Sequence, residues 1–394
     1  IENNSTFAKS YSLHNAYATG GNVVTLPYIS NNLAGLYNTR FAIANTGNAV
    51  GCIVIAYAFD GGGGFTDNGP GGSGCGSGYP VPVGGQVSFA PTAIDTALAM
   101  PGATSGRLMS ATVTSTGSTV TVGVDAFVNG QLKLGSYDGF VVGGTDDIGT
   151  NISIPVAAKT SDGFYTQILL SNTNATAATA TITYRDQTTG QTYPVNLTVP
   201  ANGTANHSVY SDAVVPVGFV GAATVTSSQP IAAVLFRIKM TTAGSFIDEP
   251  LYTAVNGVPE DRASTEVRFP LIFRRAYGNS AQCDASGANC GYNTWVAVIV
   301  PGGGSANLTL TSVNDTSNTA PNCQAAATYT TAKTITNSFI FYQNANVDNG
   351  FGQNPNCFWG GMVITSNVPI IAIANATNDL SVGDNDGAYN AFGD

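Results

Sequence analysis

Residues 221–234 read GAATVTSSQPIAAV, and residues 361–373 read GMVITSNVPIIAI. A weaker copy, MSATVTSTGSTVTVGV, occupies residues 109–124. Each copy is an apolar alternating run, a short polar group of Ser, Thr or Asn, and then a second apolar run, which is typical of a β-hairpin. Pro230 and Pro369 are expected at the start of the second strand, where the loss of one N–H donor is tolerated.

Two other elements recur upstream of these segments. The openings VTLPYI, ISIPVA and VRFPLI begin at residues 24, 152 and 267, and each is followed by an aromatic-containing segment: YNTRFAI from 37, FYTQILL from 164 and YNTWVAV from 292. Further strand-like runs, at residues 179–184, 193–199 and 308–312, alternate at period two between these elements. Many short strands in units of roughly 100 residues predict an all-β chain of three tandem immunoglobulin-like β-sandwich domains.

A boundary element occurs four times: HNAYATG (14–20), YDGFVVG (137–143), YTAVNG (252–257) and YNAFG (389–393). Its copies lie between or beyond the repeated units. The expected organisation is therefore an N-terminal extension (1–21), three sandwiches (22–146, 147–262 and 263–383) and a C-terminal boundary strand (384–394).

Three sandwiches need only three boundary strands, so one copy is surplus at one terminus or the other. An isolated strand with unpaired backbone groups is unfavourable, and a neighbouring molecule can complete it. Head-to-tail addition of this kind produces an open filament unless the rotation closes a ring. The candidate inter-subunit side chains are His14, Tyr17, Tyr389 and Phe392.

In this arrangement the chain resembles donor-strand subunits of prokaryotic extracellular filaments, which are immunoglobulin-like sandwiches with a strand beyond their own domain. The LP-x-I, Y-N-T, T-S-x-x-P-I and Y-N-A-F elements also resemble a repeat of uncharacterised secreted proteins of filamentous bacteria. The resemblance implies a homopolymeric structural subunit of a filament, tube or sheath. One departure is that donor-strand subunits usually have one sandwich, whereas three are expected here.

The composition restricts the partners. Thirteen Lys and Arg stand against 23 Asp and Glu, a formal net charge of −10, and only 9% of residues are charged. Nucleic-acid binding needs clustered cations, which this chain lacks. No apolar run approaches the length of about 20 residues that a membrane span requires. The 43% hydrophobic content nevertheless supplies apolar cores.

Six cysteines favour an oxidising compartment, and hence a secreted, extracellular or cell-surface protein. Pairing by proximity in sequence gives Cys52 with Cys75, Cys283 with Cys290, and Cys323 with Cys357, one of 15 connectivities. The zinc alternative is disfavoured because neither histidine lies near a cysteine pair.

Catalytic residues are not predicted, and the chain is interpreted as a non-enzyme. His14 stands where other boundary copies have Tyr, and His207 has only Asp212 as an acidic neighbour in sequence. An extracellular hydrolase remains an alternative, since triad residues meet only in the fold.

Two kinds of surface site remain open. Asp384 and Asp386 form a weak calcium candidate without the glutamate of an EF-hand loop, and turn chemistry explains the same residues. Asn-x-Ser/Thr sites permit glycosylation, among them those at Asn174, Asn196, Asn307 and Asn314.

The main alternative function is a cell-surface adhesin or carbohydrate-binding module whose partners are glycans. Trp295 is a candidate for a sugar-stacking platform, although packing at a domain junction is the favoured interpretation of this side chain.

Overall fold

The computed structural model describes residues 2–4, 9–11, 20–34, 37–60, 62–90, 106–128, 134–143, 148–161, 163–239, 251–274, 276, 292–315, 328–342, 358–378 and 386–393. Within these ranges the regular structure is β-strand, apart from two short 3-10 turns. All sheet pairings between these strands are antiparallel. The expectation of an all-β chain is confirmed.

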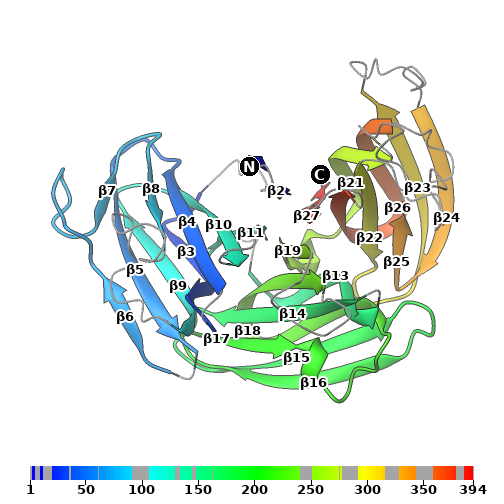
Figure 1. The fold of residues 1–394 in the computed structure, drawn as a ribbon, viewed down its shortest axis with the longest axis horizontal. Coiled ribbons are helices and arrows are strands. Elements are labelled where there is room, and N and C mark those ends of the chain that lie inside the picture. Colours follow the sequence, from blue (N-terminus) through cyan, green and yellow to red (C-terminus); the bar gives the residue numbers. More distant parts are fainter. Residues whose placement is uncertain are drawn as a thin grey trace.

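The strands form three successive groups of sheets, which lie along an open arc (Figure 1). The first group has two sheets, ordered β12-β3-β9-β5-β6, with β7 on β5, and β11-β10-β4-β8. Its strands are β3 (Val23–Asn31), β4 (Tyr37–Asn45), β5 (Gly51–Phe59), β6 (Gly64–Asp67), β7 (Tyr79–Val81), β8 (Gln86–Phe89), β9 (Arg107–Thr116), β10 (Val120–Val128), β11 (Leu134–Asp138) and β12 (Phe140–Val141).

The second group is arranged around one long strand, β18, in the order β16-β15-β18-β13-β14-β17, with β19 on β18 and β20 on β13. Two 3-10 turns, η1 (Val209–Ser211) and η3 (Glu260–Arg262), accompany it. Its strands are β13 (Gly149–Ser161), β14 (Phe164–Asn172), β15 (Ala178–Asp186), β16 (Thr192–Val199), β17 (Gly203–Ser208), β18 (Val220–Lys239), β19 (Leu251–Asn256) and β20 (Val258–Pro259).

The third group is arranged in the same way around β26, and a separate N-terminal hairpin joins β1 to β2. These strands are β21 (Ser264–Arg274), β22 (Tyr292–Ile299), β23 (Ser305–Asn314), β24 (Thr328–Thr336), β25 (Ser338–Tyr342), β26 (Phe358–Asn378), β27 (Asp386–Asn390), β28 (Phe392–Gly393), β1 (Glu2–Asn4) and β2 (Lys9–Tyr11).

The predicted hairpins at residues 221–234 and 361–373 are wrong. Each segment belongs to one long strand, β18 or β26, whose first half pairs with one set of neighbours and whose second half pairs with another. In the first group the corresponding segment is split into β9 and β10, which lie in different sheets. The polar group between the halves lies within the continuous strand and does not reverse it, and Ser227 Oγ accepts a hydrogen bond there from the backbone N–H of Gln229.

The glycine turn at residues 302–304 connects β22 to β23, which do not pair with each other. β22 pairs with β25 and β23 with β24, and the two strands pair with different halves of β26. Gly303 N–H donates to the carbonyl of Val300 (2.9 Å). Gly302 has a φ of +72°, and a positive φ at this position of a turn favours glycine.

Each group is closed by its own boundary strands. β11 and β12 pair with β10 and β3, β19 and β20 pair with β18 and β13, and β27 and β28 pair with β26 and β21. The C-terminal segment is thus part of the third group and is not a separate strand beyond it. The boundary strand therefore closes its unit in all three described copies.

In the second group, the residues that are structurally equivalent to the other boundary copies lie three positions later in the chain than the sequence alignment predicts. Phe140, Val258 and Phe392 pair with residues that each stand two positions before the repeated proline of their group, namely Thr25, Ser153 and Arg268. The structural counterparts of Asp138 are therefore Asn256 and Asn390, and Val255 takes the place of Tyr137 and Tyr389.

The apolar cores extend across the junctions between groups. The first cluster combines residues of the first sheets with Tyr165, Phe236 and Ala254 of the second group. The second cluster likewise includes Trp295, Ile340 and Ile373 of the third group. Consecutive groups are therefore held together by buried apolar side chains, which are expected to make the junctions stiff.

Candidate functional site

The boundary strands come together on the inner side of the arc (Figure 1). β11 lies beside β19, and β19 lies beside β27, although each belongs to a different group. The side-chain amide of Asn256 accepts a hydrogen bond from the backbone N–H of Asp138 (3.1 Å) and donates one to its carbonyl (2.9 Å). A side chain of one boundary strand thus pairs with the backbone of the preceding one.

A tyrosine hydroxyl anchors two of these strands to the opening of their own group. Tyr137 donates to the carbonyl of Tyr28 (2.5 Å) and also accepts from its backbone N–H (3.2 Å). Tyr389 donates in the same way to the carbonyl of Leu271, one residue after the repeated proline. Burial raises the pKa of both phenols above their ordinary value, so both stay protonated and can donate.

Of the four predicted inter-subunit residues, two lie in described strands of the third group and two lie outside the described residues. Tyr389 is 8% exposed and packs edge-on against Phe269 within its own group. Phe392 lies in β28, which pairs with β21. His14 and Tyr17 lie outside the described residues. The chain continues from them into Gly21, which bridges to Val120 in the first group.

The N-terminal hairpin β1–β2 is a two-stranded sheet of its own. Its second strand, Lys9–Tyr11, approaches β27 in the same molecule. In Figure 1 the two termini lie near each other on the inner side of the arc. The N-terminal segment is thus next to the last of the aligned boundary strands.

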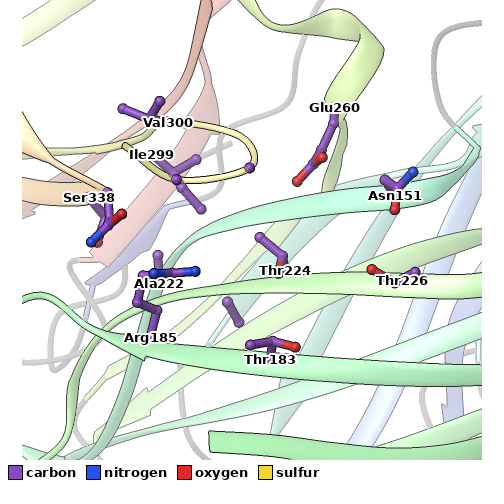
Figure 2. Close-up of a pocket in the computed structure, with 14 residues that line it drawn as sticks. Asn151, Thr183, Arg185, Ala222, Thr224, Thr226, Glu260, Ile299, Val300 and Ser338 are labelled. Atoms are coloured by element: carbon purple, nitrogen blue, oxygen red, sulfur yellow. The ribbon is translucent and has the colours of Figure 1, made fainter. Parts of the chain in front are cut away.

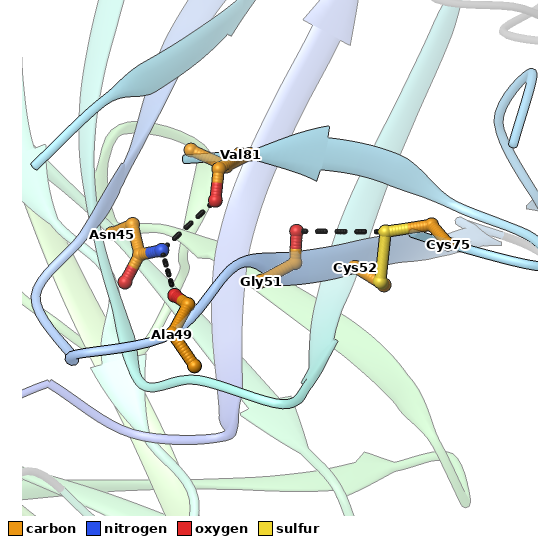
Figure 3. The surroundings of a disulfide bond; sticks show 6 residues. All are labelled: Asn45, Ala49, Gly51, Cys52, Cys75 and Val81. Atoms are coloured by element: carbon orange, nitrogen blue, oxygen red, sulfur yellow. Dashed lines mark hydrogen bonds between the residues drawn. A yellow bond between two sulfur atoms is a disulfide. The ribbon is translucent and has the colours of Figure 1, made fainter. Parts of the chain in front are cut away.

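The disulfide between Cys52 and Cys75 is formed as predicted (Figure 3). It connects β5 to a loop rich in glycine, where Gly69, Gly71, Gly72 and Gly74 all have positive φ. This loop is therefore tightly wound, and the short strand β6 precedes it in the segment between the two cysteines. Cys283, Cys290, Cys323 and Cys357 lie outside the described residues.

His207 and Asp212 do meet in the fold, at a buried network around η1. His207 Nε2 lies 3.0 Å from Asp212 Oδ2, and Tyr184 Oη lies 2.8 Å from His207 Nδ1. Burial raises the pKa of the Tyr184 hydroxyl well above its ordinary value.

The Asp212 carboxylate also accepts hydrogen bonds from the backbone N–H groups of Val214 and Val215. Burial tends to raise its pKa, but the bonds from His207, Val215 and Val214 outweigh burial and hold that pKa below its ordinary value. Both nitrogens of the His207 ring have partners, and His207 itself is 8% exposed. The network has the properties of a structural brace for the loop after η1.

Lys159 supports the same loop from β13. It is 7% exposed, and its ammonium group donates to the backbone carbonyls of Val215 (2.8 Å) and Asp212. Sequence analysis did not identify Lys159, because a single lysine within an apolar strand has no recognisable motif.

A polar pocket of about 260 Å³ opens where the second and third groups meet (Figure 2). Its floor is the outer face of β13, β15 and β18, with Asn151, Thr183, Thr224 and Thr226. The turn after β22, the start of β25 and Glu260 of η3 form its walls. Arg185 lines the pocket from the end of β15.

Trp295 packs at the junction of the second and third groups, as favoured from the sequence. It is 7% exposed and belongs to the apolar cluster of the second group. The guanidinium of Arg237 lies 4.8 Å from the Trp295 ring centroid and 3.4 Å from that of Phe164, so it is held between the two rings. Trp295 is therefore not an exposed platform for sugars.

The weaker sequence candidates are distributed as follows. Asn196 and Asn307 are exposed, Asn174 is half-buried, and Asn314 is buried at 3% exposure, which leaves no room for a glycan there in the folded chain. Asp384 lies outside the described residues, and Asp386 begins β27. The described part of the chain contains no group of three or more His, Cys, Asp or Glu side chains placed to hold a metal ion.

Among the residues that the structure describes, no helix has the length and apolar character needed to cross a bilayer. No protein-family model matches the chain, and no curated protein matches its sequence. One similar solved structure is that of Thermotoga maritima 1070, with 11% identity and a TM-score of 0.23 over 28% of this chain and 90% of that one. A likeness this slight bears on neither the fold nor the function.

Proposed function

We propose that this chain is a structural subunit of an extracellular filament, tube or sheath, which polymerises head to tail through its N-terminal boundary segment. In this proposal the three groups of sheets are tandem immunoglobulin-like sandwiches, the protein is secreted, and its partner is a second copy of itself.

The proposal is based on the observation that three of the four boundary copies pair within their own molecule. The copies at 137–143, 252–257 and 389–393 each close a group of sheets within their own molecule. The C-terminal copy is therefore not spare, and in a count of four copies for three groups His14–Gly20 is the surplus one. Strand donation is therefore assigned to the N-terminus in this proposal.

The inner side of the arc offers a binding position, or seat, for the N-terminal segment next to β27. β11, β19 and β27 lie next to one another, so β27 is the last of the series, and β2 of the same chain approaches it. Exchange of an identical element between copies converts a contact within one molecule into a contact between two. The N-terminal segment of one subunit would accordingly occupy this seat on the next.

Electron microscopy of negatively stained protein at rising concentration tests the proposal. The full chain is expected to form rods or tubes, and a variant lacking residues 1–20 is expected to remain a folded monomer. A variant lacking only residues 1–11 removes β2, which approaches β27, and keeps the boundary copy. It should still polymerise if His14–Gly20 is the donated segment, and its failure to polymerise would assign the donated segment to the hairpin instead.

Two results would contradict the proposal. One is a full chain that stays monomeric by light scattering at every concentration, and the other is polymerisation of the variant that lacks residues 1–20. Deletion of residues 386–394 is expected to have a different effect, since it removes strands paired with β26 and β21 and should unfold the third group.

A further inference from the structure

The pocket between the second and third groups contains polar groups that the fold leaves unused. Arg185 forms no ion pair or side-chain hydrogen bond with any residue that the structure describes. Ser338 is 3% exposed, and its buried hydroxyl has no hydrogen-bond partner. Buried polar groups are nearly always paired, so an unpaired one beside a cavity indicates a missing partner.

The glycine turn in the wall of the pocket lies close to Arg185. Gly303 has a φ of +84°, and a Cβ added there would lie 3.7 Å from Cζ of Arg185 and 3.0 Å from Oδ1 of Asn337. Asn337 in turn accepts a hydrogen bond from the backbone N–H of Gly304 (3.0 Å). The glycine turn thus lets the guanidinium and the amide approach the backbone closely, as ligand-binding turns require.

Glu260 stands on the other side of the pocket from Arg185 (Figure 2). Its Oε1 accepts a hydrogen bond from Ser153 (3.2 Å), and it forms no ion pair with Arg185. The floor of the pocket is lined by the threonines and by Asn151. The two ends of the pocket therefore differ in chemistry: one favours an anion, and the other accepts hydrogen bonds.

We propose that this pocket binds a small hydroxylated carboxylate the size of one sugar ring, such as a hexuronate. Arg185 takes the carboxylate, because a guanidinium matches its planar geometry with two parallel hydrogen bonds. Ser338 supplies a further hydrogen bond, and Glu260 with the threonines binds the ring hydroxyls. A volume of about 260 Å³ suits one ring and excludes a longer oligosaccharide chain from full enclosure.

The assignment does not rest on the proposed polymerisation, because every lining residue belongs to the second or third group of one molecule. The pocket also depends on the junction, since its floor and walls come from different groups. The apolar contact of Ala222 with Ile299 and Ile371 lies at this junction.

Isothermal titration calorimetry of the chain lacking residues 1–20 with glucuronate and galacturonate tests this site in the absence of polymers. At least one of the two acids is expected to bind saturably at one site, and glucose, which lacks the carboxylate, is expected to bind more weakly. Arg185→Gln should weaken binding about tenfold to a hundredfold, as expected for loss of a charge-assisted pair.

Two further variants keep the test decisive. Arg107→Gln makes the same substitution in β9, far from the pocket, and should leave binding unchanged. Ser338→Ala removes a hydroxyl without a protein partner, so it should leave thermal stability unchanged or raised while weakening binding several-fold.

Three outcomes would overturn the assignment. They are the absence of saturable binding of either acid, equal affinity for glucose, and equal loss of binding in the Arg185 and Arg107 variants when both remain folded by circular dichroism.

Discussion

At the scale of single residues, the tyrosine of the boundary strand has a defined task. Tyr137 is fully buried, and its hydroxyl serves both the N–H and the carbonyl of Tyr28. The repeated proline at position 27 precedes this point, so Tyr137 satisfies backbone groups where the register of β3 with β9 shifts between Leu26 and Ile29. Tyr389 repeats the arrangement at Leu271 in the third group.

Removal of this hydroxyl gives the first prediction. Tyr137→Phe is expected to lower the free energy of unfolding by about 1–3 kcal/mol, because two buried backbone groups lose their partner. Urea denaturation followed by circular dichroism measures the change. Tyr329→Phe is the matched control: its hydroxyl is buried without a hydrogen-bond partner, so the same substitution should be neutral or stabilising. Equal losses in both variants would refute the role assigned to Tyr137.

The Asp212 carboxylate gives a prediction about pH. Its pKa in the folded chain is lowered, so its contribution to stability is complete above the ordinary pKa and is lost as the pH falls through the folded-state pKa. Asp212→Asn should therefore destabilise the chain by about 1–2 kcal/mol at neutral pH and by progressively less in acid.

Unfolding curves between about pH 2 and pH 7 measure this difference. The exposed Asp261→Asn variant is the control, with an expected change below about 0.5 kcal/mol at every pH. A stability difference between wild type and Asp212→Asn that stays constant into acid would show that the carboxylate charge is not what braces the loop.

At the scale of elements, the long strands β18 and β26 connect the parts of each group. The first half of β18 pairs with β13 and β15, and the second half pairs with β14 and β19. One strand therefore contributes to both sets of neighbours, and a break in it would uncouple them. Gly221 lies within the first half, where an added Cβ would meet the carbonyl of Arg185. A side chain at this position would push β15 away from β18.

The disulfide gives a prediction at this scale. Cys52 and Cys75 are separated by 23 positions, and their bond restricts the unfolded chain as well as the loop. Replacement of both by serine is expected to cost about 3 kcal/mol of stability by the loop-entropy relation. Guanidinium denaturation of the variant and of the wild type provides the measurement. The difference should vanish under reducing conditions; its persistence there would assign the effect to packing of the sulfur atoms.

At the scale of the whole molecule, the arc is held by contacts between groups that are distant in sequence. Apolar clusters cross both junctions, and Asn256 reaches from the second group to the backbone of Asp138 in the first. The corresponding residue of the third group, Asn390, has a buried Oδ1 without a hydrogen-bond partner. The two junctions therefore differ in their polar contacts, although their strands are arranged alike.

This difference gives a matched pair of variants. Asn256→Ala should weaken the first junction by about 1–3 kcal/mol, because the N–H and carbonyl of Asp138 lose their partner. Asn390→Ala should have little effect. Differential scanning calorimetry is expected to show an earlier, separate unfolding transition only for Asn256→Ala. A single unchanged transition in both variants would mean that the apolar contacts alone hold the groups together.

The sequence by itself determined the features that depend on local pattern. Period-two alternation identified β15, β16 and β23, the repeated openings located β3, β13 and β21, and the boundary copies marked where each group closes. The pairing of Cys52 with Cys75, one of 15 connectivities, was predicted from proximity in sequence and is confirmed. These features could be predicted because alternation and turn chemistry act over a few neighbouring residues.

Only the tertiary structure decided how those strands are joined. A polar group between two apolar runs is compatible with a hairpin and with one long strand that changes its pairing partners midway, and the choice depends on neighbours far away in sequence. The same is true of Asn256 with Asp138, and of Arg185 and Ser338, which both line the pocket. Such residues have no common motif, because their proximity is fixed by packing between groups, which a local pattern does not encode.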